Sequence, residues 1–319
     1  MSGIIITGAT GFLGGVLARR LAASGEHVMA VGRSKDKLGD LQALGIEAHS
    51  LDLSDPQSPL PGVKADAIVH CAALSTPWGR REAFLGANVT GTRTAIALAR
   101  AAGVNRLIHV STPSLYFRFE DQDSVQEDSP LPQPVNAYAD SKLKAEALVL
   151  AASDLDPIIL RPRGLYGVGD TSLLPRLLRA AAGRPLPLMR GGRAATDLTH
   201  VDDLVGSVLA ALHVSRPDRR IFNISGGQAL RVRDIAERAG KLAGVSVRWR
   251  SVPVGLVRAY ARSAETACAL LPGRPEPPIT EYGVGLFAYR QTLDISEAAR
   301  GLGWRPSIDF DEGLRRTFV

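Results

Sequence analysis

At 319 residues, with 45% hydrophobic and 22% charged side chains, the chain is long enough for one large α/β domain with an appendage, and this composition excludes a mainly disordered protein. The net charge of +6 permits a polyanionic partner, but the arginines are scattered and no nucleic-acid-binding motif accompanies them, so we expect no nucleic-acid partner. No apolar run is long enough to span a bilayer, and the first strand leaves no room for a signal peptide, so we expect a cytoplasmic location. Cys71 and Cys268 match no metal-ligand spacing, so we expect neither a metal site nor a disulfide.

The chain opens on a strand, a glycine turn and a helix. Residues 4–6 are an all-apolar run typical of a buried parallel strand, and helical apolar spacing starts at residue 16. Glycines between them would let a pyrophosphate approach the backbone N–H groups at the helix N-terminus, although a purely steric turn is the alternative. The flanking strand and helix favour a dinucleotide site, which we assign to Gly8, Gly11, Phe12, Leu13 and Gly14.

The next two strands carry candidates for the adenosine end of the dinucleotide. An apolar run at 27–31 ends in Gly32, where an acidic residue would accept hydrogen bonds from the ribose of NAD. Arg33 instead suits the 2′-phosphate of NADP, with a solvated arginine as the alternative. A third strand near 47–51 leads to Asp52 and Leu53, and Asp52 can accept the adenine amino group or merely cap a turn.

Small residues follow the fourth strand, which we place at 67–71. Ala72 and Ala73 leave space for a ligand at the carboxyl edge of the sheet, where open α/β sheets bind their ligands. His70, inside the strand, is interpreted as a core or edge histidine rather than a catalyst.

Hydroxyl groups, a tyrosine and a lysine come next. A fifth strand at 106–110 delivers Ser111, Thr112 and Ser114 to the same edge of the sheet. After a loop rich in acidic residues and proline (120–134), a helix opens with Tyr138 and Lys142, which lie one turn apart on one face.

The second half of the chain loosens the alternation of strands and helices. A sixth strand at 157–161 ends in Pro162 and Arg163, and Arg163 is the better candidate among the arginines for a substrate carboxylate. A seventh strand is expected at 220–224 and helices near 231–243, 253–270 and, as the last, 295–302. We therefore predict an α/β fold, a Rossmann-type doubly wound parallel sheet with a smaller C-terminal substrate lobe. Residues 1–170 form the dinucleotide-binding domain, to which 200–225 return, and 171–319 form mainly the lobe.

Five motifs in this order resemble the extended short-chain dehydrogenase/reductases, over essentially the whole chain. They are Gly8-x-x-Gly11-x-x-Gly14, Asp52-Leu53, Asn88-Val89-x-Gly91-Thr92, Tyr138-x-x-x-Lys142 and His200-Val201-Asp202-Asp203. The stretch from Leu160 to Asp170 and the tail from Pro277 to Trp304 are similar to the 3β-hydroxysteroid dehydrogenase-like branch, and within it to the 2-alkyl-3-oxoalkanoate reductases of bacterial olefin synthesis.

The resemblance implies an oxidoreductase that moves a hydride between nicotinamide and a carbonyl carbon. Tyr138 would protonate the oxygen, Thr112 would donate a hydrogen bond to it, and the charge of Lys142 would favour the ionised phenol. We expect NADP(H) as the coenzyme, with NAD(H) as the alternative, a small hydrophobic carbonyl or alcohol substrate, and a homodimer through the helices that carry Asn88 and Tyr138. The resemblance implies coenzyme contacts at the glycine turn, Arg33 and Asp52-Leu53. It also implies contacts at Cys71, Ala72, Ala73, Asn88, Lys142 and Pro162.

Departures from the family's pattern separate a reductase from its alternatives. Dehydratases keep an Asp-Glu pair where this chain has Pro113-Ser114, which argues against dehydration. Nucleotide-sugar epimerases typically keep an Asn at Gly164 and often an acidic residue at Gly32, so an epimerase is disfavoured but stays the alternative. A cofactor-sensing protein without catalysis would have lost Tyr138 or Lys142. We expect a reductase of the ketone of a hydrophobic 3-oxo compound, a β-keto acid or a steroid-like molecule.

Overall fold

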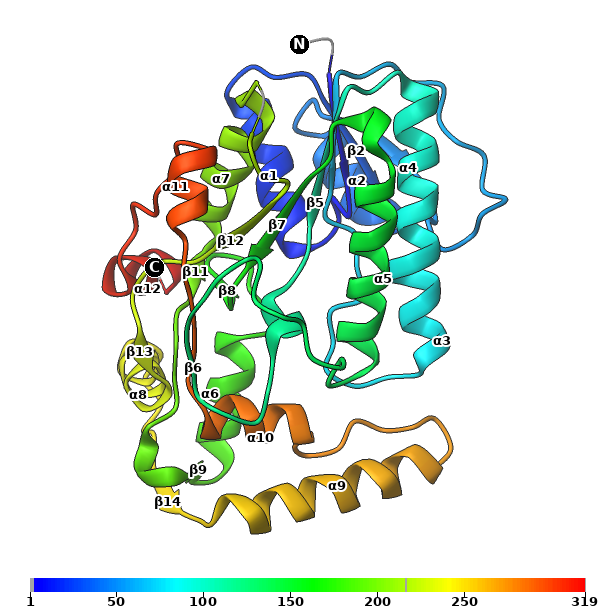
Figure 1. The fold of residues 1–319 in the computed structure, drawn as a ribbon. Coiled ribbons are helices and arrows are strands. Elements are labelled where there is room, and N and C mark those ends of the chain that lie inside the picture. The colour runs from blue at the N-terminus through cyan, green and yellow to red at the C-terminus, as the bar shows by residue number, and fades with distance from the viewer. Residues whose placement is uncertain (1–2, 216, 319) are drawn as a thin grey trace.

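The computed structural model describes residues 3–215 and 217–318, and its centre within these residues is a seven-stranded parallel sheet (Figure 1). The strand order is β12-β7-β5-β4-β1-β2-β3 and reverses between β1 and β4, the point at which such sheets bind ligands. The strands are β1 (Ile4–Thr7), β2 (Val28–Gly32), β3 (Glu47–Ser50), β4 (Ala67–His70), β5 (Arg106–Val110), β7 (Ile158–Pro162) and β12 (Ile221–Ile224). The predicted Rossmann-type sheet is confirmed, and the strand expected at 220–224 lies at its edge.

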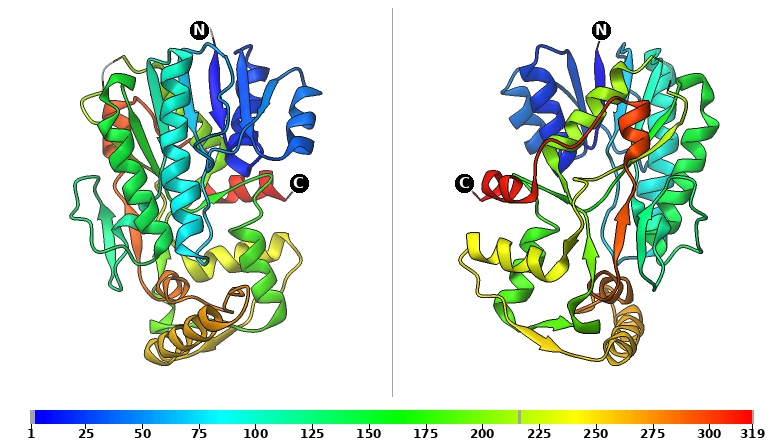
Figure 2. Two further views of the ribbon diagram at one scale, coloured as in Figure 1. Left: turned by 90° about the vertical axis from the view of Figure 1, so that its right-hand side faces the viewer. Right: turned by 60° about the vertical axis from the view of Figure 1, so that its left-hand side comes forward.

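Helices cover both faces of this sheet. One face carries α1, α7 and α11, and the other carries α4 and α5 (Figures 1 and 2). The helices are α1 (Phe12–Ala23), α2 (Lys35–Gln42), α3 (Arg81–Phe84), α4 (Gly91–Ala102), α5 (Ala137–Ala151), α6 (Leu174–Gly183), α7 (Val201–His213), α8 (Val232–Leu242), α9 (Val254–Leu270), α10 (Glu281–Ala288), α11 (Ser296–Gly301) and α12 (Phe310–Thr317), with a π-helical segment, η1 (Leu85–Thr90), between α3 and α4. Among the described residues, no helix combines the length and the apolar character that crossing a membrane requires.

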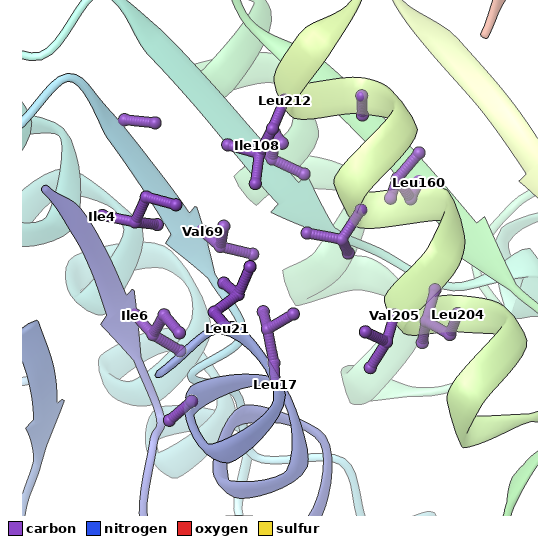
Figure 3. Close-up of a cluster of buried hydrophobic side chains, with 14 of the residues drawn as sticks. Ile4, Ile6, Leu17, Leu21, Val69, Ile108, Leu160, Leu204, Val205 and Leu212 are labelled. Atoms are coloured by element: carbon purple, nitrogen blue, oxygen red, sulfur yellow. The ribbon is translucent and has the colours of Figure 1, made fainter. Parts of the chain in front are cut away.

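The side chains of β1 show why helices have to cover both faces of the sheet. Ile4 and Ile6 pack into one core with Leu204 of α7, and Figure 3 shows these side chains between the sheet and the helices. Ile5 points the other way, into a second core with Leu98 of α4. Since successive strand residues face opposite sides, an all-apolar run is what a strand buried on both faces requires.

A smaller lobe lies below the sheet in Figure 1 and contains α6, α8, α9 and α10. Its own core joins α6, α8 and α12, with Leu178, Ile235 and Leu314 buried together. Short strands connect the lobe internally and to the main sheet. They are β13 (Leu230–Arg231), β10 (Ala195–Thr196), β15 (Gln291–Leu293) and β6 (Gln122–Val125) in one sheet, β8 (Leu165–Tyr166) with β11 (Thr199–His200), and β9 (Leu186–Leu188) with β14 (Trp249–Ser251).

Two expectations about local structure were wrong. The loop expected at 120–134 contains β6, which pairs in parallel with β15, a partner far away in the sequence. The helix at 295–302 corresponds to α11, but it is not the last one, because α12 follows it, and α10 precedes it unpredicted. The N-cap of α12, Asp309, accepts a hydrogen bond from the backbone N–H of Glu312 at 2.8 Å. An acid three residues before a glutamate is a helix-start pattern that the sequence already contained.

Candidate active site

The glycine turn forms a cradle in which side chains do not fit. Gly8 has a φ of +68°, and a Cβ atom there would lie 2.7 Å from the backbone nitrogen of Ala72. A Cβ atom on Gly14 would lie 2.3 Å from the carbonyl oxygen of Gly8. The N-cap of α1, Gly11, supplies no side-chain hydrogen bond, so the N–H groups of Phe12 and the residues after it face outward at the positive end of the helix. These residues fit a dinucleotide pyrophosphate.

The adenosine end of this cradle carries cations. Arg33 is exposed. The pKa of Asp52 is lowered mainly by hydrogen bonds from Ser54, and the charge of Arg33 lowers it further. Asp52 accepts those bonds from the backbone N–H of Ser54 at 3.0 Å and from its hydroxyl at 2.7 Å, so it caps a turn. Lys37, which the sequence analysis did not single out, donates to the carbonyl oxygen of Thr10 at 3.3 Å. Arg33 and Lys37 both suit a phosphate.

Tyr138 lies in the first turn of α5. The side chain of Asn136 caps this helix by accepting a hydrogen bond from the N–H of Ala139 at 2.9 Å. Burial raises the pKa of Tyr138 to about 12, while a hydrogen bond with Thr112 lowers it and Tyr282 raises it. The phenol is therefore protonated at neutral pH, as a proton donor must be. Of the three candidate hydroxyls after β5, it is Thr112 that the structure brings to Tyr138.

Lys142 is buried one turn further along α5. Its Nζ atom donates to the carbonyl oxygen of Val110 at 2.8 Å and to Nε2 of His109 at 3.0 Å. Burial lowers the pKa of Lys142 to about 8, and the charge of Glu146 opposes this shift. The groups that shift the pKa of Tyr138 do not include Lys142, contrary to our expectation, because its ammonium group is directed at β5.

His109 was missed by the sequence analysis, although a polar residue in an apolar strand could have revealed it. Its ring stacks on that of His70 with centroids 5.2 Å apart. The ring nitrogens of His70 lie 2.7 Å from the Thr7 hydroxyl and 3.1 Å from the Thr92 hydroxyl, which confirms it as a core histidine. Burial lowers the pKa of both histidines, to about 3 for His70. A neutral His109 can accept the hydrogen bond from Lys142.

The remaining predicted coenzyme residues lie after β3 and β4, in η1 and at the end of β7. Burial raises the pKa of the Cys71 thiol to about 12, so it is no nucleophile, and Cys71 and Cys268 are both free thiols. Ala72 lies against Gly8, Ala73 follows it, Leu53 is buried after β3, and Pro162 ends β7. Asn88 uses its amide inside the protein, accepting from the N–H of Leu74 at 2.7 Å and donating to the Ser141 hydroxyl at 2.8 Å. Its role is to join η1 to the loop after β4 and to α5.

A cavity of about 240 Å³ lies beside Tyr138. The ring of Phe84 in its wall is 6.3 Å from the ring of Tyr138, and Tyr282 of α10 lines it from the lobe. The acid Glu281 in its wall pairs with Arg258 and Arg262. The lining residues are Pro77, Trp78, Gly79, Phe84, Val135, Asn136, Ala137, Glu265, Glu281 and Tyr282. The arrangement places a cavity whose wall combines apolar rings with polar side chains next to a protonated phenol.

Several motif residues turn out to stabilise the fold. Asp203 accepts hydrogen bonds from the N–H groups of Ser307 and Ile308 and so fastens the C-terminal segment to α7. His200 caps α7 by accepting from the N–H of Asp202 at 3.3 Å.

The sequence and the fold were compared with those of known proteins, and both comparisons find related chains. The sequence model described as "NAD dependent epimerase/dehydratase family" matches residues 4–225. The 2-alkyl-3-oxoalkanoate reductase of Stenotrophomonas maltophilia is 34% identical, over 98% of this chain and 97% of its own length. The decarboxylating sterol-4-alpha-carboxylate 3-dehydrogenase of Mus musculus is 27% identical, over 98% and 89%. The crystal structure of UDP-glucuronic acid 4-epimerase from Bacillus cereus with NAD shares the fold, with a TM-score of 0.73, 22% identity and coverage of 99% and 97%.

Proposed function

Because the chain belongs to the NAD dependent epimerase/dehydratase family and is an NAD(P)-dependent oxidoreductase, we propose that it reduces the ketone of a hydrophobic 3-oxo compound with NADPH. The observation that carries the proposal is the interaction of Tyr138 with Thr112 beside the cavity, with Lys142 buried one helical turn further along α5. The names of the two relatives above, for a 3-oxoalkanoate and a sterol carboxylate, support this substrate class.

The residues at this point can bind and protonate a carbonyl oxygen. Thr112 and Tyr138 can both donate hydrogen bonds to one oxygen atom, and the phenol, with a pKa of about 12, can give its proton to the developing alkoxide. The Lys142 ammonium, fixed by Val110 and His109 one helical turn from Tyr138, is proposed to contact the bound coenzyme. The bound coenzyme would supply the hydride, and the glycine cradle, Leu53, Cys71, Ala72, Ala73 and Pro162 are the residues proposed to hold it.

The coenzyme preference is also part of the proposal. Gly32 offers no carboxylate to the ribose of NAD, and Arg33 and Lys37 place two cations beside the same end of the cradle. A 2′-phosphate is the group that such cations would bind through charge-assisted hydrogen bonds. The resemblance further supports a homodimer through α4 and α5, which analytical ultracentrifugation tests directly.

The experiment is an NADPH-oxidation assay with purified protein and a panel of 3-oxo acids, ketosteroids and aldehydes. We expect turnover with medium-chain or long-chain 3-oxo acids, and loss of most turnover in Tyr138→Phe. No turnover on any of these substrates with either coenzyme would refute the proposal. Coenzyme that stays bound through purification, together with interconversion of nucleotide sugars without net turnover of added coenzyme, would identify an epimerase instead.

A further inference from the structure

A line of interacting polar side chains leads from the proton donor into the lobe. It begins with Tyr138 and Thr112, and the Thr112 hydroxyl lies 2.9 Å from the Ser114 hydroxyl. Tyr282 of α10 then hydrogen bonds with both Ser114 and Arg163. Four separate segments, α5, the turn after β5, α10 and the loop after β7, thus meet in one line of polar side chains.

The guanidinium at the end of this line is a buried cation. The Arg163 side chain is only 7% exposed, and its Nε atom donates to the Thr196 hydroxyl at 2.8 Å. Within the part of the chain that the structure describes, no carboxylate oxygen lies within 4.0 Å of its nitrogens. The acid that faces it, Asp197, acts only at longer range and accepts a hydrogen bond from the N–H of Leu293. Buried charges are normally paired at close range, and among the described residues this cation has no carboxylate in direct contact.

The spacing of the hydroxyl groups suits a 3-oxo acid. In such a molecule one carbon separates the ketone from the carboxylate, so the two groups can reach neighbouring donors. A ketone oxygen held by Tyr138 and Thr112 would place the carboxylate against Ser114 and Tyr282, because the Thr112 and Ser114 hydroxyls are 2.9 Å apart. Arg163 hydrogen bonds with Tyr282 there and would supply the opposite charge.

We propose that Arg163, Tyr282 and Ser114 form a carboxylate subsite beside the carbonyl-binding pair, so that the enzyme selects 3-oxo acids over their neutral analogues. This inference rests on the proposed reductase function and specifies its substrate class. The apolar tail of the acid then lies against the apolar part of the cavity wall, which includes Pro77, Trp78 and Phe84. A neutral analogue would leave the buried guanidinium without an anion, and the lost charge-assisted hydrogen bonds correspond to about 10-fold to 100-fold in kcat/KM.

The experiment compares 3-oxododecanoate with its methyl ester and with 2-undecanone, its decarboxylation product, by NADPH oxidation. We expect the wild type to reduce the acid with a kcat/KM at least tenfold above those of the two neutral compounds. Arg163→Gln should lower kcat/KM for the acid by about 10-fold to 100-fold, mainly through KM, and change that for the ester by less than twofold. Tyr282→Phe should lower kcat/KM for the acid several-fold, and Arg163→Lys should retain part of the preference for the acid over the ester. Arg179→Gln, which removes an exposed arginine of α6, is the matched control.

Two results would overturn the subsite while the reductase function survives. They are equal kcat/KM values of the wild type for acid and ester, or equal losses for both in Arg163→Gln. Turnover of neither compound with either coenzyme would mean that the reductase function itself fails. If Arg163→Gln does not fold, the subsite is tested on the wild type alone, by its preference for the acid and by inhibition of ester reduction. Dodecanoate should then bind as an inhibitor at least tenfold more tightly than methyl dodecanoate. Equal inhibition by these two compounds would refute the subsite.

Discussion

Coenzyme choice depends on a few residues at the end of β2, and Arg33→Ala tests it. A charge-assisted hydrogen bond to the 2′-phosphate contributes about 1.5 to 3 kcal/mol. Arg33 is exposed, and part of its field acts on Asp52, so the lower end of this range applies. About 1.5 kcal/mol corresponds to roughly a tenfold loss in the ratio of kcat/KM for NADPH to that for NADH.

Reversal of the preference needs a third substitution that the structure reveals. A Cβ atom on Gly32 would lie 2.6 Å from Cγ2 of Thr10 and 2.9 Å from its hydroxyl oxygen. Gly32→Asp alone therefore has to displace the Thr10 side chain. Thr10→Ala removes both close atoms and leaves the Thr10 Cβ position at 3.3 Å. We expect the combination of Thr10→Ala, Gly32→Asp and Arg33→Ala to favour NADH over NADPH.

Initial rates with both coenzymes, measured at low and at high salt, provide the assay. The native preference for NADPH should shrink as salt rises, since exposed charges are screened. Arg93→Ala, which removes an exposed arginine of α4, is the control and should leave the ratio unchanged. A native enzyme that already prefers NADH, or an Arg33→Ala variant with an unchanged ratio, would show that this account of the loop is wrong.

Three further predictions concern the catalytic pair and the fold behind it. Tyr138→Phe should lower kcat by about 10²-fold to 10⁴-fold with coenzyme affinity unchanged by fluorescence titration, because only the proton donor is lost, and equal kcat in both proteins would contradict its role. The kcat/KM for reduction should fall as pH rises above about 8, where Lys142 loses its charge, and a profile flat to pH 10 would contradict this. Glu146→Ala should lower the free energy of unfolding in urea by about 3 to 5 kcal/mol, because it strands the buried Arg161 that Glu146 contacts at 2.5 Å, and an unchanged value would disprove this ion pair's importance.

Structural features that depend on the types of neighbouring residues in the sequence were predictable from the sequence. The glycine turn was predictable from the spacing of its glycines between a strand and a helix, and a side chain on Gly14 would collide with the carbonyl oxygen of Gly8, six residues earlier. The run 4–6 is apolar because both faces of β1 are buried. Tyr138 and Lys142 share a helix face because four residues make about one turn. Each of these patterns is local, so the sequence alone determined it.

Long-range contacts decided the rest. Lys142 meets His109 across 33 residues, and Tyr282 reaches Arg163 and Ser114 only when α10 packs under the sheet. The helix α10 contains two glycines, which disfavour a helix, yet Gly285 is needed because a Cβ atom there would lie 2.2 Å from the ring of Phe117. The polar segment of β6 becomes a strand through its pairing with β15, 169 residues away at Gln122 and Gln291. No local pattern encodes such a partner, because the free energy that selects these conformations comes from packing and hydrogen bonds that exist only in the folded chain.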